Sequence, residues 1–115
     1  MSIIDPTIVD AQSVTPDGKG VALLISDHLT WENEQKHLEA LQEKLNAYVA
    51  YLRGGQFAQH FPGMEFFYAV IDIHFLHGIT ARCQQFLKAV QQSVGEFGIQ
   101  ISVTLTKPAD ENLKS

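Results

Sequence analysis

The chain has 115 residues, of which 8 are basic and 13 acidic, and a formal net charge of −5. This length predicts one domain, at residues 1–106, followed by a flexible polar tail at 107–115. The acidic balance argues against a nucleic-acid groove or an anionic membrane surface as the partner. The lone cysteine, Cys83, excludes an internal disulfide and is typical of a reducing compartment. Because we find no secretory leader pattern and no apolar run near the ~20 residues of a membrane helix, we expect a cytoplasmic protein.

The first two elements are expected to form a β-hairpin. Residues 7–14 are rich in β-branched side chains, and residues 15–20 read Thr-Pro-Asp-Gly-Lys-Gly, which is strong turn chemistry. Residues 21–26 follow as a nearly continuous apolar run. Two strands separated by such a turn predict an antiparallel pair.

An amphipathic helix is predicted next, because apolar residues recur every seven positions. The repeat and the residues interleaved with it are Trp31, Leu38, Leu41, Leu45, Tyr48 and Leu52. Together they form one apolar helix face. Thr30 is the expected N-cap, and Gly54 and Gly55 provide the expected C-terminal stop.

The second half predicts a strand, a helix and a strand after a loop at 55–65. In the strand at 66–76, one face is apolar from Phe67 to Phe75, and the other carries polar side chains. The helix is expected at 81–97, with Thr80 as its cap and Gly98 as its end. The strand at 99–106 alternates, with Ile99, Ile101, Val103 and Leu105 expected to point inward.

The order β-β-α-β-α-β predicts an α+β or α/β fold, a two-layer sandwich with a four-stranded mixed sheet. Right-handed crossovers that step in one direction place both helices on the same face of the sheet. We therefore expect the second, third and fourth strands to be parallel, with the first antiparallel beside the second.

A candidate ligand edge lies where the predicted parallel strands end. It collects Asp27, His28 and His77, with Trp31 and Tyr48 as lining residues. Helix N-termini and a histidine beside a carboxylate favour an anion or a small acidic ligand. The simpler interpretation, which we favour, is that Asp27 and Thr30 form and cap a strand-to-helix turn while both histidines lie in solvent.

Metal binding and thiol chemistry each have a weak pattern. Glu34 and His37 have the Glu-x-x-His spacing of di-iron bundles, but the second predicted helix supplies no matching pair, so surface polar residues are the better account. Cys83 lies in the first turn of a helix beside Arg82, which would activate a thiol, yet it also begins an apolar stripe and is better explained as core. We expect no metal and no cofactor.

A candidate interface face lies on the polar side of the sheet. Its members alternate onto one face of two predicted strands: Tyr68, Asp72, His74, Ser102 and Thr104. They resemble a Ser–His–Asp set in composition, but a triad is defined by geometry, and no Gly-x-Ser-x-Gly elbow is present. A solvated face or a partner surface is the alternative.

The segment Asp27-His28-Leu29-Thr30-Trp31, followed by Leu41-Gln42-Glu43-Lys44 and by Asn46 and Tyr48, carries a resemblance. Together with residues 8–11, Ile-Val-Asp-Ala, it is similar to a family of short bacterial proteins of unknown function. The resemblance covers the first half well and the second half only in outline. It implies a small cytoplasmic domain and transfers no catalytic role.

These observations favour a non-enzymatic protein-interaction module, as a homo-oligomer or with a protein partner. The alternative is a small-molecule or anion-binding domain, such as a hydrolase or isomerase, that uses the edge of Asp27, His28 and His77. The two hypotheses place the site at different parts of the sheet.

Overall fold

The computed structural model describes residues 9–105. Its regular elements are β1 (Ala11–Val14), β2 (Gly20–Asp27), α1 (Glu34–Arg53), the 3-10 helix η1 (Gln56–His60), β3 (Tyr68–Phe75), α2 (Ala81–Val94), the 3-10 helix η2 (Gly95–Phe97) and β4 (Ile99–Leu105). The expected tail at 107–115, the start of the first predicted strand at 7–8 and residue 106 lie outside the described residues.

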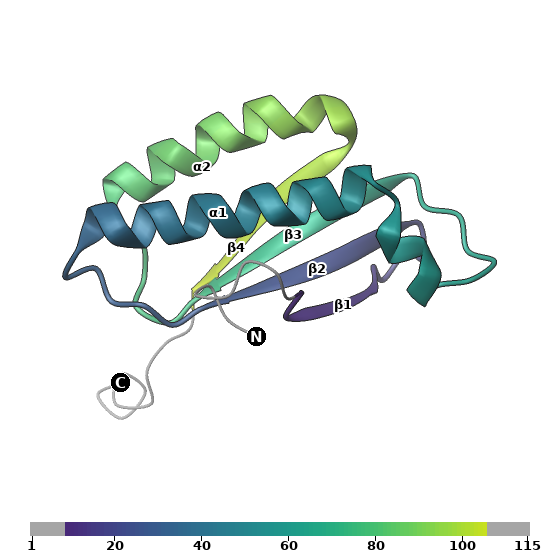
Figure 1. The fold of residues 1–115 in the computed structure, drawn as a ribbon, viewed down its shortest axis with the longest axis horizontal. Coiled ribbons are helices and arrows are strands. Elements are labelled where there is room, and N and C mark those ends of the chain that lie inside the picture. The colour runs from purple at the N-terminus through teal and green to yellow at the C-terminus, as the bar shows by residue number, and fades with distance from the viewer. Residues whose placement is uncertain (1–8, 106–115) are drawn as a thin grey trace.

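The four strands form one mixed sheet in the order β1-β2-β3-β4. β1 is antiparallel to β2, while β2, β3 and β4 are parallel. Both helices cover the same face of this sheet (Figure 1). This arrangement confirms the predicted two-layer fold and the expected strand directions, and it is the one that crossovers of the usual right-handed sense produce when they step in the same direction.

The core lies between the two helices and the sheet, and most of it is formed by α1 and the two central strands. The strands contribute alternate residues, as a pleated strand with one covered face must: Val21, Leu23, Ile25, Ala69, Ile71, Ile73 and Phe75. From α1 the apolar stripe contributes Leu38, Leu41, Leu45, Tyr48 and Leu52. The helical and strand periodicities predicted from the sequence are thus the ones that build the core.

The start of α1 differs from the prediction. Asn33, not Thr30, is the N-cap, and its side chain accepts a hydrogen bond from the Lys36 amide at 3.2 Å. Trp31 therefore precedes the helix instead of opening its apolar stripe. The chain needs several residues to pass from the end of β2 to the helix layer, and Thr30 lies in that connection.

The second half holds three smaller differences. α2 is capped by Thr80 as predicted, but it ends at Val94 and continues as the tighter η2. β3 begins at Tyr68, which leaves Phe67 71% exposed. Val103 and Leu105, expected inward, are 39% and 52% exposed. The reason is that both lie at the far end of β4, an edge strand with no further strand on its outer side among residues 9–105.

Neither helix within residues 9–105 has the length and apolar character needed to cross a membrane.

Candidate functional site

The carboxyl end of β2 holds a buried aspartate–histidine pair. Asp27 is the last residue of β2, and its Oδ2 lies 2.6 Å from Nε2 of His37, which projects from the first turns of α1. The other carboxylate oxygen accepts the Leu29 amide at 3.1 Å. The opposite ring nitrogen of His37, Nδ1, faces the Thr30 carbonyl at 3.0 Å. Both side chains are almost completely buried, so the pair joins strand, loop and helix.

The proton positions in this pair follow from its partners. A carbonyl oxygen can only accept a hydrogen bond, so Nδ1 of His37 carries a proton and donates a hydrogen bond to the Thr30 carbonyl. One further proton lies between Nε2 and Asp27, because a pair without it would bury a net charge. Burial raises the pKa of Asp27, and the hydrogen bond from His37 opposes that rise. The pair is chemically competent for proton transfer, but it has no access to solvent.

Trp31 covers this pair and ties it to the next crossover. Its indole stacks on the His37 ring with centroids 3.6 Å apart, and Nε1 donates to the Gly78 carbonyl at 2.9 Å. His28 and His77 are exposed at the same edge. Of the five residues predicted for the ligand edge, the structure therefore joins Asp27 and Trp31 in one network and leaves the two histidines outside it.

Tyr48, the fifth predicted edge residue, belongs to a different buried network. Its hydroxyl donates to the Leu24 carbonyl at 2.5 Å and accepts the Asp10 amide at 2.8 Å. Burial raises its pKa well above the ordinary value. The fully buried Lys44 lies one turn earlier, with Nζ 3.2 Å from Asp10 Oδ1. This network joins α1 to the start of β1, which lies beside the carboxyl half of β2 because the two strands are antiparallel, and Asp10 Oδ2 accepts the Ser26 amide there at 2.8 Å.

The thiol of Cys83 is a core group. Its side chain is buried under α2, and its amide donates to the Thr80 hydroxyl at 3.1 Å. Burial raises its pKa to about 12, and the charges of Asp27 and Glu34 act in the same direction. Because the thiolate is the reactive form, this environment makes Cys83 inert and favours the core interpretation.

The predicted interface residues share the open face of the sheet. His74 Nε2 lies 2.8 Å from Asp72 Oδ2, and the Thr104 hydroxyl donates to Asp72 Oδ1 at 3.2 Å. Ser102 is the register partner of Asp72 on β4. The structure thus brings His74, Asp72 and Thr104 together. They form a half-exposed row, with the Asp72 side chain 33% exposed.

The open face also carries a hollow of about 230 Å³ beside this row. It is floored by small side chains of the hairpin, Ala11, Ser13 and Ala22, and it is bounded by Asp72 and His74. A volume of this size accommodates a side chain rather than a drug-sized ligand, because ligand pockets usually exceed ~300 Å³.

Tyr68, the fifth predicted interface residue, is held at the amino end of the sheet. Its hydroxyl donates to the Asp17 carboxylate at 2.8 Å, and Asp17 also accepts the Thr15 hydroxyl at 2.6 Å. These bonds, with the Lys19 amide, lower the pKa of Asp17 to about 2. The Tyr68 ring lies over Gly20, where a Cβ would stand 2.5 Å from ring carbon Cε2. Glycine at position 20 is therefore what allows the ring to lie there.

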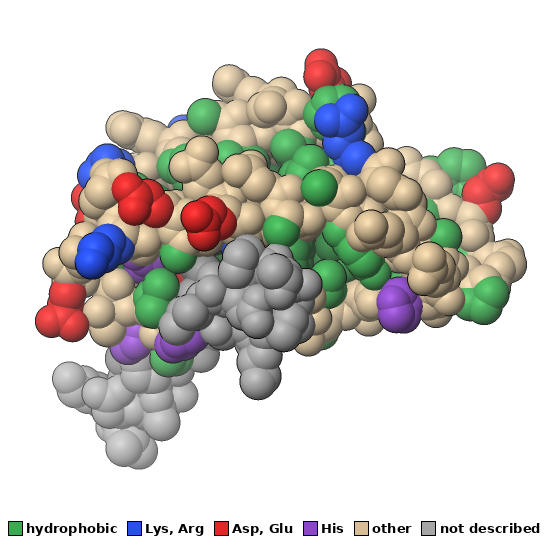
Figure 2. All heavy atoms as spheres, viewed as in Figure 1, with side chains coloured by type: hydrophobic (Ala, Val, Ile, Leu, Met, Phe, Trp, Pro, Cys, Tyr) green, Lys and Arg blue, Asp and Glu red, His purple; other side chains and the backbone are tan. Residues whose placement is uncertain are grey.

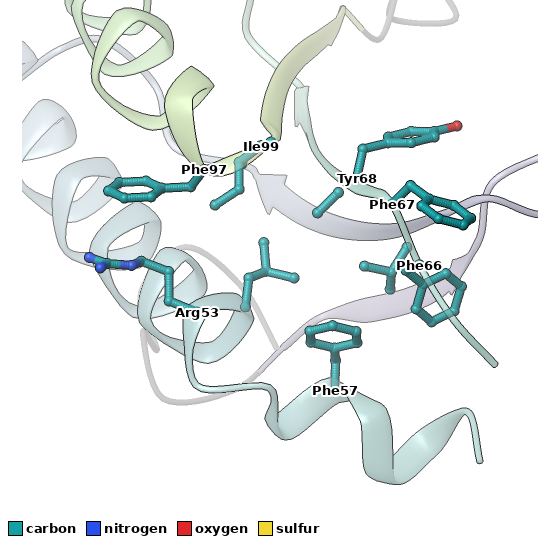
Figure 3. Close-up of a pocket in the computed structure, with 11 residues that line it drawn as sticks. Arg53, Phe57, Phe66, Phe67, Tyr68, Phe97 and Ile99 are labelled. Atoms are coloured by element: carbon teal, nitrogen blue, oxygen red, sulfur yellow. The ribbon is translucent and has the colours of Figure 1, made fainter. Parts of the chain in front are cut away.

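Two hollows on the helix side adjoin α1. A cavity of about 160 Å³ at the amino ends of the strands is lined by aromatic and aliphatic side chains, with Phe57 and Phe66 on one side and Arg53 beside Phe97 on the other (Figure 3). The guanidinium carbon of Arg53 lies 4.1 Å from the Phe97 centroid, a cation–π contact. Apolar side chains also line a furrow of about 270 Å³ between α1 and α2 (Figure 2). Neither hollow collects groups for acid–base chemistry.

Metal ligands do not gather in the described part of the chain, where no three His, Cys, Asp or Glu side chains form a group that could hold an ion. The interpretation of Glu34 and His37 as surface residues was wrong for His37, which is 2% exposed. The reason is that His37 faces the sheet and pairs with Asp27, whereas Glu34 lies on the rim with its carboxylate 3.6 Å from Arg82.

Comparison with known proteins identifies the family of this chain. A family of unknown function, DUF6572, matches residues 1–107. The chain belongs to this family. The match extends beyond the first half that carried the resemblance and confirms it. Searches for similar curated proteins and for similar solved structures find no match. Membership therefore assigns no activity, and function must be argued from the site itself.

Two residues of the buried networks, His37 and Lys44, were not foreseen. Their positions did carry a signal, because 37, 41, 44 and 48 follow the 4-3-4 spacing of a single helix face that contains Leu41 and Tyr48. A polar residue within an apolar stripe indicates a buried partner, since an unpaired buried charge is costly.

Proposed function

We propose that this chain is a non-enzymatic interaction module that binds a basic protein partner through the open face of its sheet. The observation that carries the proposal is the hollow beside the half-exposed Asp72 carboxylate. A lysine or arginine side chain of a partner fits this hollow, with its charged end at Asp72 and its stem over Ala11 and Ala22.

The charge on this face supports a basic partner. Of the described strand residues that alternate onto this face, Asp72 is the acidic one, and none is lysine or arginine. The chain as a whole carries a net charge of −5. Complementary charge steers association and selects partners more than it adds affinity.

The state of the other chemical groups supports binding over catalysis. The buried groups that could do chemistry are Asp27, His37, Lys44, Tyr48 and Cys83. Their polar atoms are engaged in hydrogen bonds or ion pairs or, for the thiol, burial raises the pKa. A catalytic group must reach a substrate, which these groups do not in this conformation.

The test introduces positive charge on the open face. The wild type, Ser102→Lys and a matched control, Gln85→Lys on the exposed side of α2, are tagged and compared in captures from the host lysate. We expect one stoichiometric protein of basic isoelectric point with the wild type and the control, and its loss with Ser102→Lys. A partner that Ser102→Lys retains, or that both variants lose equally, would contradict the proposal.

The alternative function, anion or small-molecule binding at the carboxyl edge, keeps the exposed His28 and His77 as its only available candidates, since Asp27 is bonded within the core. His28→Ala and His77→Ala should then abolish any ligand-induced rise in the melting temperature. Under the proposed function the same changes leave partner capture unaltered, so this pair of variants separates the two.

A further inference from the structure

The outer edge of β4 lacks the features that usually prevent an edge strand from pairing with a strand of another molecule. Its sequence, Ile-Gln-Ile-Ser-Val-Thr-Leu at 99–105, contains no charged residue, no proline and no glycine. Natural edge strands usually carry such residues or are very short, because their unpaired backbone groups bind other strands. The opposite edge strand, β1, has four residues. β4 is therefore the edge suited to pairing.

The backbone of β4 is only partly satisfied on its outer side. The Gln91 side chain donates to the Ile99 carbonyl at 3.1 Å and accepts the Ile101 amide at 2.7 Å. These contacts show that the odd-numbered residues of β4 direct their backbone groups outward, since alternate residues of a strand face the same side. Within residues 9–105, no side chain caps the outward groups of Val103 and Leu105 in this way.

The side chains beside this open stretch are apolar and exposed. Val103 and Leu105 lie on the helix side of the edge at 39% and 52% exposure. A hollow of about 440 Å³ adjoins them between α2 and β4. Its lining includes Ile79, Leu87 and Ile101, with Lys88 as its only charged residue. A protruding leucine and an apolar hollow thus lie on either side of Val103 along the same strand.

We propose that two copies of this chain pair their β4 strands in antiparallel fashion about a two-fold axis at Val103. Val103 of one copy then lies opposite Val103 of the other, and Leu105 lies opposite Ile101 of the second copy. The outward N–H of Leu105 donates to the Ile101 carbonyl of the second copy. The two Val103 residues form two hydrogen bonds with each other, each N–H donating to the opposite carbonyl. Gln91 already occupies the Ile101 amide, so it confines the pairing to residues 101–105.

The β4 edge is complementary to itself, and this is why we infer that its partner is a second copy of the chain. Directly opposite residues of an antiparallel pair project to the same face, so Leu105 of each copy enters the hollow at Ile101 of the other. A two-fold axis requires a patch and its complement on one surface, and this strand provides both. The inference is independent of the open-face proposal, because it uses the strand edge and the helix side.

Mass measurement tests the association. Light scattering or sedimentation of the wild type should give about twice the chain mass of 12.8 kDa, falling to one chain mass on dilution. Val103→Glu places like charges directly opposite each other and should weaken association roughly 100-fold or more. Gln100→Glu, on the same strand but facing the open side, should leave it unchanged. A wild type that stays at one chain mass into the millimolar range would overturn the inference, as would equal effects of both variants.

Cysteine cross-linking tests the register without relying on a destabilising charge. In Val103→Cys the two thiols face each other at a Cα separation of about 5.5 Å, within reach of a disulfide. In Leu105→Cys they lie four residues apart along the strand, roughly 13 Å. Mild oxidation should therefore link Val103→Cys and not Leu105→Cys. The reverse result, or no cross-link from either variant, would overturn the proposed axis.

Discussion

The two ends of the β2–β3 pair are held by aspartates in opposite environments. At the carboxyl end, Asp27 and His37 are both 2% exposed, and burial raises the pKa of Asp27. At the amino end, Asp17 is exposed, and hydrogen bonds lower its pKa to about 2. The buried aspartate depends on its partner to offset its desolvation, while the exposed one is stabilised by bonds that cost little to form. One end should therefore fail when a single group is lost, and the other should weaken gradually.

The largest effect is expected at the carboxyl end. His37→Ala removes the side chain that hydrogen-bonds Asp27 within residues 9–105 and leaves a buried carboxylate beside a cavity. Breaking one partner of a buried pair costs about 3–5 kcal/mol. Urea unfolding should show this loss, whereas Glu39→Ala, on the exposed side of the same helix, should stay within about 0.5 kcal/mol of the wild type. A loss below about 1 kcal/mol for His37→Ala would mean that the pair does not hold this end.

A smaller loss is expected at the amino end from Gly20→Ala. The new methyl group would meet the Tyr68 ring at 2.5 Å, so ring or backbone must shift. Overpacking of this kind costs about 1–3 kcal/mol. The double variant Gly20→Ala/Tyr68→Ala should lose less stability than the sum of the two single changes, because the clash is then absent. Strict additivity in this cycle would show that the ring does not govern position 20.

The pH dependence separates the two aspartates. Because the pKa of Asp17 falls from 3.8 unfolded to about 2 folded, its contribution is present above pH 3.8 and is lost as the pH falls toward 2. Asp27 acts in the opposite direction: its raised pKa means that the folded state binds more protons, so its contribution declines as the pH rises above 3.8. In the wild type, the free energy of unfolding should fall as the pH drops from 3.8 toward 2, and in Asp17→Asn this fall should be absent. An unchanged fall would assign it to other carboxylates.

The last prediction concerns the rate at which a thiol reagent labels Cys83, which reports how readily the carboxyl end opens. Cys83 is buried, and its pKa is about 12, so a thiol reagent should react slowly with the native protein and at once in denaturant. In His37→Ala, where the carboxyl end is weakened, the native rate should rise. Fast labelling of the native wild type would show that this end opens readily, and the contrast between the two ends would then disappear.

The elements were more predictable than the contacts between them. The hairpin turn, the stripe of α1 and the alternation of β3 follow from local chemistry and period, and the structure keeps them. The capping of α1 by Asn33 was missed because Thr30 is an equally good cap by residue type. The exposure of Val103 and Leu105 was missed because alternation identifies the face of a strand but not whether a neighbour covers it.

The sequence alone determined the layers of this protein, since side-chain period decides which face of each element is apolar, and the strand-helix-strand order with the right-handed preference of crossovers places both helices on one face. Tertiary structure alone decided the roles of the polar residues. Asp27 and His37 are ten positions apart, and Tyr48 and Asp10 thirty-eight, so nothing local couples them. Whether a carboxylate is a ligand, a base or a buried partner depends on its distance to other groups and on its exposure, and both arise only when the chain is folded.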